Sequence, residues 1–95
     1  MAGYLIAEVD VTDPEAYEEY KRIVPAAVES HGGRFLVRGG AVVPKEGGWT
    51  PKRMIVIEFA SLAAAQVFYD SPEYARALEI RLKATNSRLL LVEGA

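Results

Sequence analysis

The chain has 95 residues, a net charge of −2 and no cysteine, which excludes disulfides, thiolate metal sites and a cysteine nucleophile. Basic and acidic residues are interspersed, so no basic stripe could follow a phosphate backbone and we expect no nucleic-acid partner. Hydrophobic residues make up 51% and charged residues 25%, the balance of a folded domain. We expect one domain over residues 1–95. The start of the chain has neither the basic region nor the long apolar run of a signal or membrane segment, so we expect a cytoplasmic protein without a membrane partner.

The first two elements are a strand and a helix. Residues Tyr4–Val11 alternate between two faces, which predicts a strand. A helix follows, and its start can be explained in two ways. Either Thr12 caps it with Glu15 three residues on, or Asp13 caps it with Pro14 in the first turn.

The first helix has one stripe that faces the sheet. The stripe residues recur at spacings of three and four: Tyr17, Tyr20, Val24, Ala27 and His31. Pro25 lies inside this helix and lacks a backbone donor, so we expect a kink near Lys21. The pair Gly32–Gly33 ends the helix, because glycine adopts the left-handed cap conformation without strain.

Two further strands surround a long loop. Residues Arg34–Arg38 alternate as a strand, and Gly39–Gly40 permits a bulge or turn after it. The stretch 43–52 is rich in glycine and proline and is expected to be a loop. Residues Arg53–Phe59 alternate again and predict the third strand.

The last third of the chain predicts a broken helix and a strand. Ser61 is the expected cap of a helix over Leu62–Tyr69, and Ser71 with Pro72 restarts a second helical piece. Residues 85–87 are expected to break that piece before a final strand over Arg88–Glu93.

The order βαββαβ predicts an α+β, ferredoxin-like fold: a four-stranded antiparallel sheet with helices on one face. We expect the helix-facing side chains to be Leu5, Val9, Phe35, Val37, Ile57 and Phe59. The other face should then carry Tyr4, Ile6, Leu36, Met54 and Val56. Monomers rarely expose an apolar patch of this kind, so we expect a homodimer with its sheets paired face to face. Glu8, Arg38 and Glu58 are expected on the covered face, where opposite charges could pair.

Five blocks of the sequence resemble the family called domain of unknown function 1330. They are Y-L-I-A-E-V-D-V-T-D-P-E-A-Y-E-E-Y, H-G-G-R-F-L-V-R-G-G, I-V-I-E-F, F-Y-D-S-P-E-Y and R-L-L-L-V-E-G. The resemblance implies membership of the dimeric α/β-barrel superfamily, with ferredoxin-like protomers joined sheet to sheet. Relatives there include cofactor-free monooxygenases, haem-degrading enzymes and ligand-sensing domains, and many hold a small ligand between sheet and helices. This breadth leaves the function open.

His31 and a group of three charged residues are candidates for chemistry. His31 is the only histidine and could act as a general base, although a structural role at a helix end requires fewer assumptions. Arg38 and Glu58, together with Glu8, could hold a carboxylate or carry a proton, or could form an interface salt bridge.

A second group of candidates could line a ligand pocket with an apolar wall and a few polar tips. Its members are Tyr17, Tyr20, Tyr69, Ser71, Tyr74 and Arg81. Aromatic residues at helical spacing are also the usual content of a core. Trp49, in the glycine-rich loop, could be a lid over a ligand or, as we prefer, a clasp on the partner subunit.

The sequence therefore supports a small homodimeric protein that binds or transforms an organic metabolite without a metal or cofactor. The alternative is a ligand sensor or structural module without turnover. RNA binding by a domain of the same strand order is disfavoured, because the third strand, R-M-I-V-I-E-F, lacks the required aromatic residues.

Overall fold

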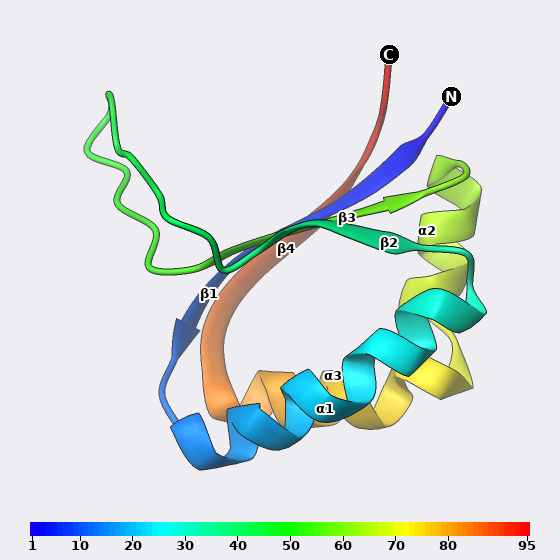
Figure 1. Ribbon diagram of the computed structural model, residues 1–95, viewed down its shortest axis with the longest axis horizontal. Helices are drawn as coiled ribbons and strands as arrows, with labels where there is room; N and C mark the ends of the chain where they lie inside the picture. The colour runs from blue at the N-terminus through cyan, green and yellow to red at the C-terminus, as the bar shows by residue number, and fades with distance from the viewer.

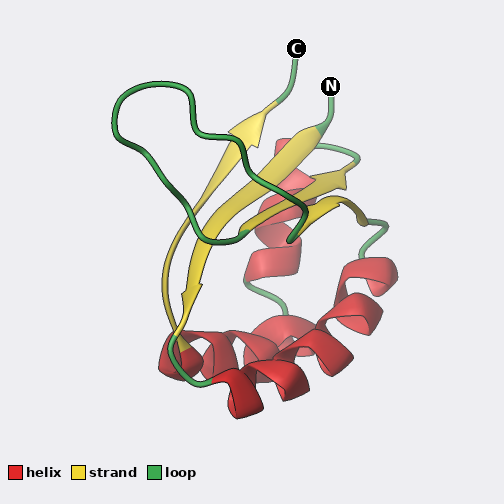
Figure 2. Cartoon of the chain, turned by 60° about the vertical axis from the view of Figure 1, so that its left-hand side comes forward, coloured by secondary structure: helices red, strands yellow, loops and turns green.

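The computed structural model describes residues 1–95 and has the element order βαββααβ. The strands are β1 (Gly3–Val11), β2 (Arg34–Arg38), β3 (Met54–Phe59) and β4 (Thr85–Glu93). The helices are α1 (Pro14–Ser30), α2 (Leu62–Tyr69) and α3 (Pro72–Ala84). All strand pairs are antiparallel, in the order β2-β3-β1-β4. The helices cover one face of the sheet, and the β2–β3 loop projects on the other side (Figures 1 and 2). The expected ferredoxin-like topology is confirmed.

Local sequence signals set the helix boundaries. Asp13, rather than Thr12, caps α1: its carboxylate accepts a hydrogen bond from the Ala16 amide at 3.2 Å, and Pro14 takes the first helical position. Ser61 and Ser71 cap α2 and α3 in the same way, so the predicted break of the second helical region is confirmed. None of the helices is long and apolar enough to span a bilayer.

The core lies between the helices and the inward face of the sheet. The alternate residues Leu5, Ala7 and Val9 of β1 are buried there, as are Ile55, Ile57 and Phe59 of β3. Aromatic side chains of α2 and α3 fill the middle, with the ring centroid of Phe68 5.0 Å from that of Phe59 and 4.6 Å from that of Tyr74. Gly3 is required at the edge of this core, because a Cβ atom there would lie 2.4 Å from the backbone of Ser61.

Two predictions about the strands were wrong. A bulge between Phe35 and Val37 shifts the register of β2, so Val37 pairs with the outward-facing Val56 and Arg38 pairs with the inward-facing Ile55. A bulge adds one residue and thereby reverses the faces of those that follow. The second error concerns β4, which begins at Thr85, directly after α3, with no break over residues 85–87.

Candidate functional site

A buried arginine occupies the interface between α3 and the sheet. Arg81 is 3% exposed. Its Nε donates a hydrogen bond to the Tyr74 hydroxyl at 3.3 Å, and its Nη1 donates one to Ser87 Oγ at 2.5 Å. Thr85, at the end of α3, donates its hydroxyl proton to the Arg81 carbonyl at 2.7 Å and contacts Ser87 Oγ at 3.1 Å. Tyr74 of the same helix and Ser87 of β4 therefore hold the guanidinium in place.

Tyrosine side chains extend this polar group toward α1. The hydroxyls of Tyr20 and Tyr74 lie 3.2 Å apart. Tyr17 stacks on Tyr20 with a centroid distance of 5.3 Å, and Tyr69 lies beside Tyr74 at 5.8 Å. The pocket residues predicted from helical spacing are thus brought together, except Ser71, whose hydroxyl accepts from the Tyr74 amide and donates to the Phe68 carbonyl as a helix cap.

Of the predicted pocket residues, Tyr17, Tyr20, Tyr74 and Arg81 line a cavity of about 10 Å³, and Tyr69 and Ser71 do not. This volume is roughly the room of one water molecule. Its lining is almost entirely apolar apart from the tyrosine hydroxyls and the guanidinium: Leu5, Ala7, Val9, Tyr17, Tyr20, Ile55, Ile57, Phe68, Tyr74, Arg81 and Leu89. The cavity is therefore too small for a metabolite in this conformation, and a metabolite could bind only if side chains moved.

The electrostatics of the cavity favour binding over proton transfer. Burial raises the pKa of the Tyr20 hydroxyl above its usual range, and the adjacent Tyr74 adds to the rise, so Tyr20 stays neutral at physiological pH. Burial lowers the pKa of the Arg81 guanidinium, but the neighbouring Tyr74, Tyr20 and Tyr69 together raise it, and the net shift is upward. The cavity thus holds a permanent cation and neutral hydroxyls.

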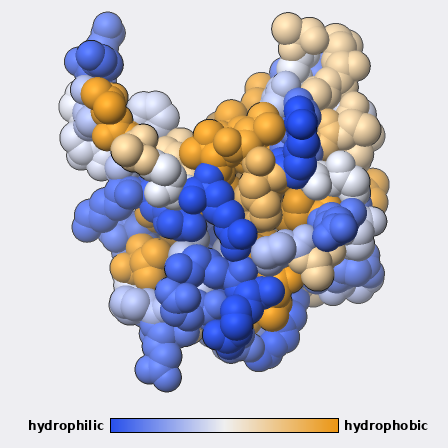
Figure 3. Space-filling view, in the orientation of Figure 1, coloured by the Kyte–Doolittle hydropathy of each residue, from blue (hydrophilic) through white to orange (hydrophobic).

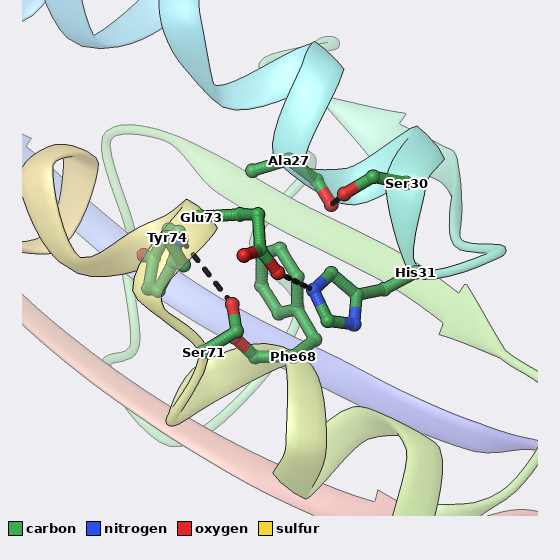
Figure 4. A network of polar contacts seen from close by, with 7 residues as sticks. All are labelled: Ala27, Ser30, His31, Phe68, Ser71, Glu73 and Tyr74. Atoms are coloured by element: carbon green, nitrogen blue, oxygen red, sulfur yellow. Dashed lines mark hydrogen bonds and ion pairs between the residues drawn. The ribbon is translucent and has the colours of Figure 1, made fainter.

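His31 lies outside this cavity, at the end of α1. Its Nε2 is 2.8 Å from Glu73 Oε1, and its ring meets the edge of Phe68 at a centroid distance of 5.8 Å. Figure 4 shows the imidazole beside the Phe68 ring, with one ring nitrogen directed at the Glu73 carboxylate. The contact joins the end of α1 to the start of α3, which fits the structural role weighed for His31.

Arg38 does not join Glu8 and Glu58, contrary to the sequence-based prediction. The bulge in β2 turns Arg38 to the helix side, where its Nη2 donates to the Lys21 carbonyl at 2.9 Å and its guanidinium lies 4.6 Å from the Phe35 ring centroid. The Lys21 carbonyl is the one that Pro25 cannot bond within α1, because proline has no amide proton. Arg38 therefore supplies the hydrogen bond that Pro25 removes from the helix.

This pairing predicts a coupling between Arg38 and Pro25. Replacing Arg38 by Met should lower the free energy of unfolding by about 0.5–1.5 kcal/mol, the usual net value of one hydrogen bond. In a Pro25→Ala background the helix satisfies the Lys21 carbonyl itself, so the loss should be smaller. A double-mutant cycle in urea measures the difference; equal losses in both backgrounds would show that the hydrogen bond is not coupled to the proline.

Glu8 and Glu58 do lie on the outward face, each with a partner from its own chain. Glu58 accepts from Arg34 Nε at 2.8 Å and from the Tyr4 hydroxyl at 3.3 Å. Glu8 accepts from Arg88 Nε at 2.9 Å and from Trp49 Nε1 at 3.2 Å. The hydrogen bond from Arg88 holds the pKa of Glu8 below its usual value. Neither carboxylate needs a partner subunit to be paired.

The outward face is apolar between these two ion pairs. The strand register aligns Val37, Val56, Ile6 and Leu90 across all four strands. Trp49 folds over one side of this row and closes a hollow of about 250 Å³ with Ile6, Glu8, Met54, Arg88 and Leu90. Apolar atoms gather in the depression between the β2–β3 loop and the chain termini (Figure 3).

Sequence reasoning missed Ser87, Thr85 and Arg53. Ser87 and Thr85 occupy inward-facing positions of β4, but residues 85–87 were expected to be a break, which concealed their alternation. Arg53 donates from Nε to the Tyr17 hydroxyl at 3.1 Å. No spacing rule connects Arg53 to Tyr17, because they come from different elements.

The strand order and the helices on one face of the sheet define a ferredoxin-like α+β protein. The model of the family described as "Domain of unknown function (DUF1330)" matches residues 2–95. The chain belongs to this family, as the resemblance in its sequence indicated. None of the curated proteins matches the chain.

Solved structures share the fold at low sequence identity. A protein of unknown function from Rhodopseudomonas palustris is 20% identical, with a TM-score of 0.74 over 99% of this chain and 82% of that one. A dimeric ferredoxin-like protein of unknown function from Jannaschia sp. CCS1 is 11% identical, with a TM-score of 0.75 over 99% and 100% of the two chains. SnoaB, a cofactor-independent oxygenase from Streptomyces nogalater, is 13% identical, with a TM-score of 0.64 over 99% and 93%. These likenesses establish the fold.

Proposed function

We propose that the chain is a homodimeric binding protein for a small organic molecule, which it holds between its sheet and its helices. The observation that carries this proposal is the cavity lined by Tyr17, Tyr20, Tyr74 and Arg81. It combines an apolar wall with a few convergent polar groups, the usual composition of a small-molecule site.

Binding without acid–base turnover is favoured by the placement of the titratable groups. A general base must lie within hydrogen-bond reach of the proton that it removes. His31 is paired with Glu73 outside the cavity, Glu58 is on the opposite face of the sheet, and Arg38 is held by the Lys21 carbonyl. The candidates for chemistry therefore do not converge on the cavity or on one another.

The dimer is supported by the outward face of the sheet. Its apolar central row lies between the Glu8–Arg88 pair and the Glu58–Arg34 pair, so a second copy would meet an apolar core with a charged rim that is already paired. Two proteins with a similar fold, one from Jannaschia sp. CCS1 and one from Thermobifida fusca, are dimeric ferredoxin-like proteins.

Thermal-shift screening against a metabolite library tests the binding function. A ligand present at about 100 times its Kd should stabilise the protein by about 2.7 kcal/mol, a shift of several degrees in Tm. Recovery of an unchanged compound after incubation would support a binding protein. Conversion to product that persists in the His31→Gln variant would show turnover at the cavity, and a library without any hit would contradict the proposal.

A further inference from the structure

We propose that the molecule held in the cavity is a small organic anion, a carboxylate, whose charge pairs with Arg81. This inference rests on the proposed binding function and adds the chemical class of the ligand.

The first observation is that Arg81 is a buried cation without an anion. Seven ion pairs occur in the chain, and none includes Arg81. Its partners are the neutral hydroxyls of Tyr74 and Ser87. Buried charges in proteins are normally paired, because removing a charge from water is costly.

The second observation is that the surrounding hydroxyls do not require the guanidinium. Tyr74 retains the Tyr20 hydroxyl as a partner, and Ser87 retains the Thr85 hydroxyl. An apolar side chain of similar length at position 81 would therefore leave none of these groups without a hydrogen bond. Packing and hydrogen bonding thus do not explain why a charged residue occupies this position.

The third observation is that some N–H donors of the guanidinium make no hydrogen bond within the chain. Its hydrogen bonds come from Nε and Nη1, which leaves Nη2, an atom that the protein does not fully enclose, for a ligand. An arginine fork matches the two oxygens of a carboxylate. The Tyr74 and Tyr20 hydroxyls lie beside it and could donate to the same oxygens.

Tyr17 lines the cavity, and basic side chains surround it on the side that faces away from the cavity. Arg53 donates to the Tyr17 hydroxyl and stacks near its ring, and Lys21 lies 5.9 Å from the centroid of the same ring. Arg53 and Arg38 have no carboxylate partner, whereas Lys21 is paired with Glu18. If the Tyr17 ring moves, the cavity opens toward this cationic surface, which would attract an anion.

The test compares carboxylates with their neutral amides. Acetate, isobutyrate and benzoate, and the three matching amides, are titrated into the wild-type dimer by calorimetry and thermal shift. At least one carboxylate should bind, and its amide should bind roughly 10- to 100-fold more weakly, the ratio expected when a charged hydrogen bond becomes a neutral one.

Arg81→Met should weaken carboxylate binding by a similar roughly 10- to 100-fold. Arg76→Met is the matched control, since Arg76 lies on the same helix but pairs with Glu19 at the surface; it should bind as the wild type does. Without ligand, Arg81→Met should melt within a few degrees of the wild type, because Tyr74 and Ser87 keep the Tyr20 and Thr85 hydroxyls as hydrogen-bond partners.

The remaining outcomes distinguish failure of the anion inference from failure of the binding function. If amides bind as well as acids, or if Arg81→Met keeps its affinity, the anion inference is wrong and the binding function stands. If the unliganded Arg81→Met variant melts several degrees lower or does not fold, Arg81 is structural and the inference is again wrong. If neither these probes nor the metabolite library bind, both proposals fail.

Discussion

Leu90→Glu is expected to convert the protein from a dimer into a folded monomer. Leu90 is 55% exposed in the isolated chain and lies in the apolar row of the outward face. A two-fold interface would bury the new carboxylate twice, and each burial costs several kcal/mol. The dimer dissociation constant should therefore rise by about 10³ or more, equivalent to about 4 kcal/mol. Sedimentation velocity over a range of protein concentrations measures this change.

Leu82→Glu is the control for this substitution. Leu82 is similarly exposed, at 62%, but lies on α3 on the helix side of the sheet, so the variant should remain a dimer. Circular dichroism of Leu90→Glu should match the wild type, because the side chain makes no part of the protomer core. A Leu90→Glu protein that still sediments as a dimer would place the interface elsewhere.

The parts of the fold that were predicted correctly depend on local chemistry. Alternation in β1 and β3 and the caps Ser61 and Ser71 involve neighbours within four residues, and the structure confirms them. The bulge at Leu36 is different. Its position is set by how β2 pairs with β3, so the sequence around the Gly39–Gly40 pair placed it several residues too late. The error moved Val37 and Arg38 to the wrong faces.

The candidate site was predictable in its members but not in its geometry. Helical spacing placed Tyr17 and Tyr20 on one inward stripe and Tyr74 and Arg81 on another, and these four do meet. The size of the cavity depends on how tightly rings from α1, α2 and α3 pack against one another. Sequence patterns contain no information about that packing.

Phe68→Ala is expected to cause the largest loss of stability. Phe68 is 0% exposed and its ring contacts those of Phe59, Tyr74 and His31. Removing a buried phenyl ring costs about 3–5 kcal/mol, because the transfer free energy is lost and a cavity remains. Urea denaturation at a fixed protein concentration measures the loss, since the proposed dimerisation would add to the apparent stability. Val67→Ala, at a neighbouring position that is 61% exposed, should change stability by no more than about 0.5 kcal/mol.

Phe68 also lines the small cavity beside Arg81, so the same substitution tests whether that space can hold a ligand. The cavity should grow by on the order of 100 Å³, enough to approach the volume that accommodates benzene in an apolar protein interior. Benzene should then raise the free energy of unfolding of Phe68→Ala more than that of the wild type, because the space is already formed in the variant, whereas in the wild type side chains must move to make it. A loss of less than about 1 kcal/mol, with no effect of benzene, would mean that α2 and α3 collapse into the vacated space. In that case the helices can move against the sheet, and the cavity of the wild type could adopt sizes other than the one in this structure.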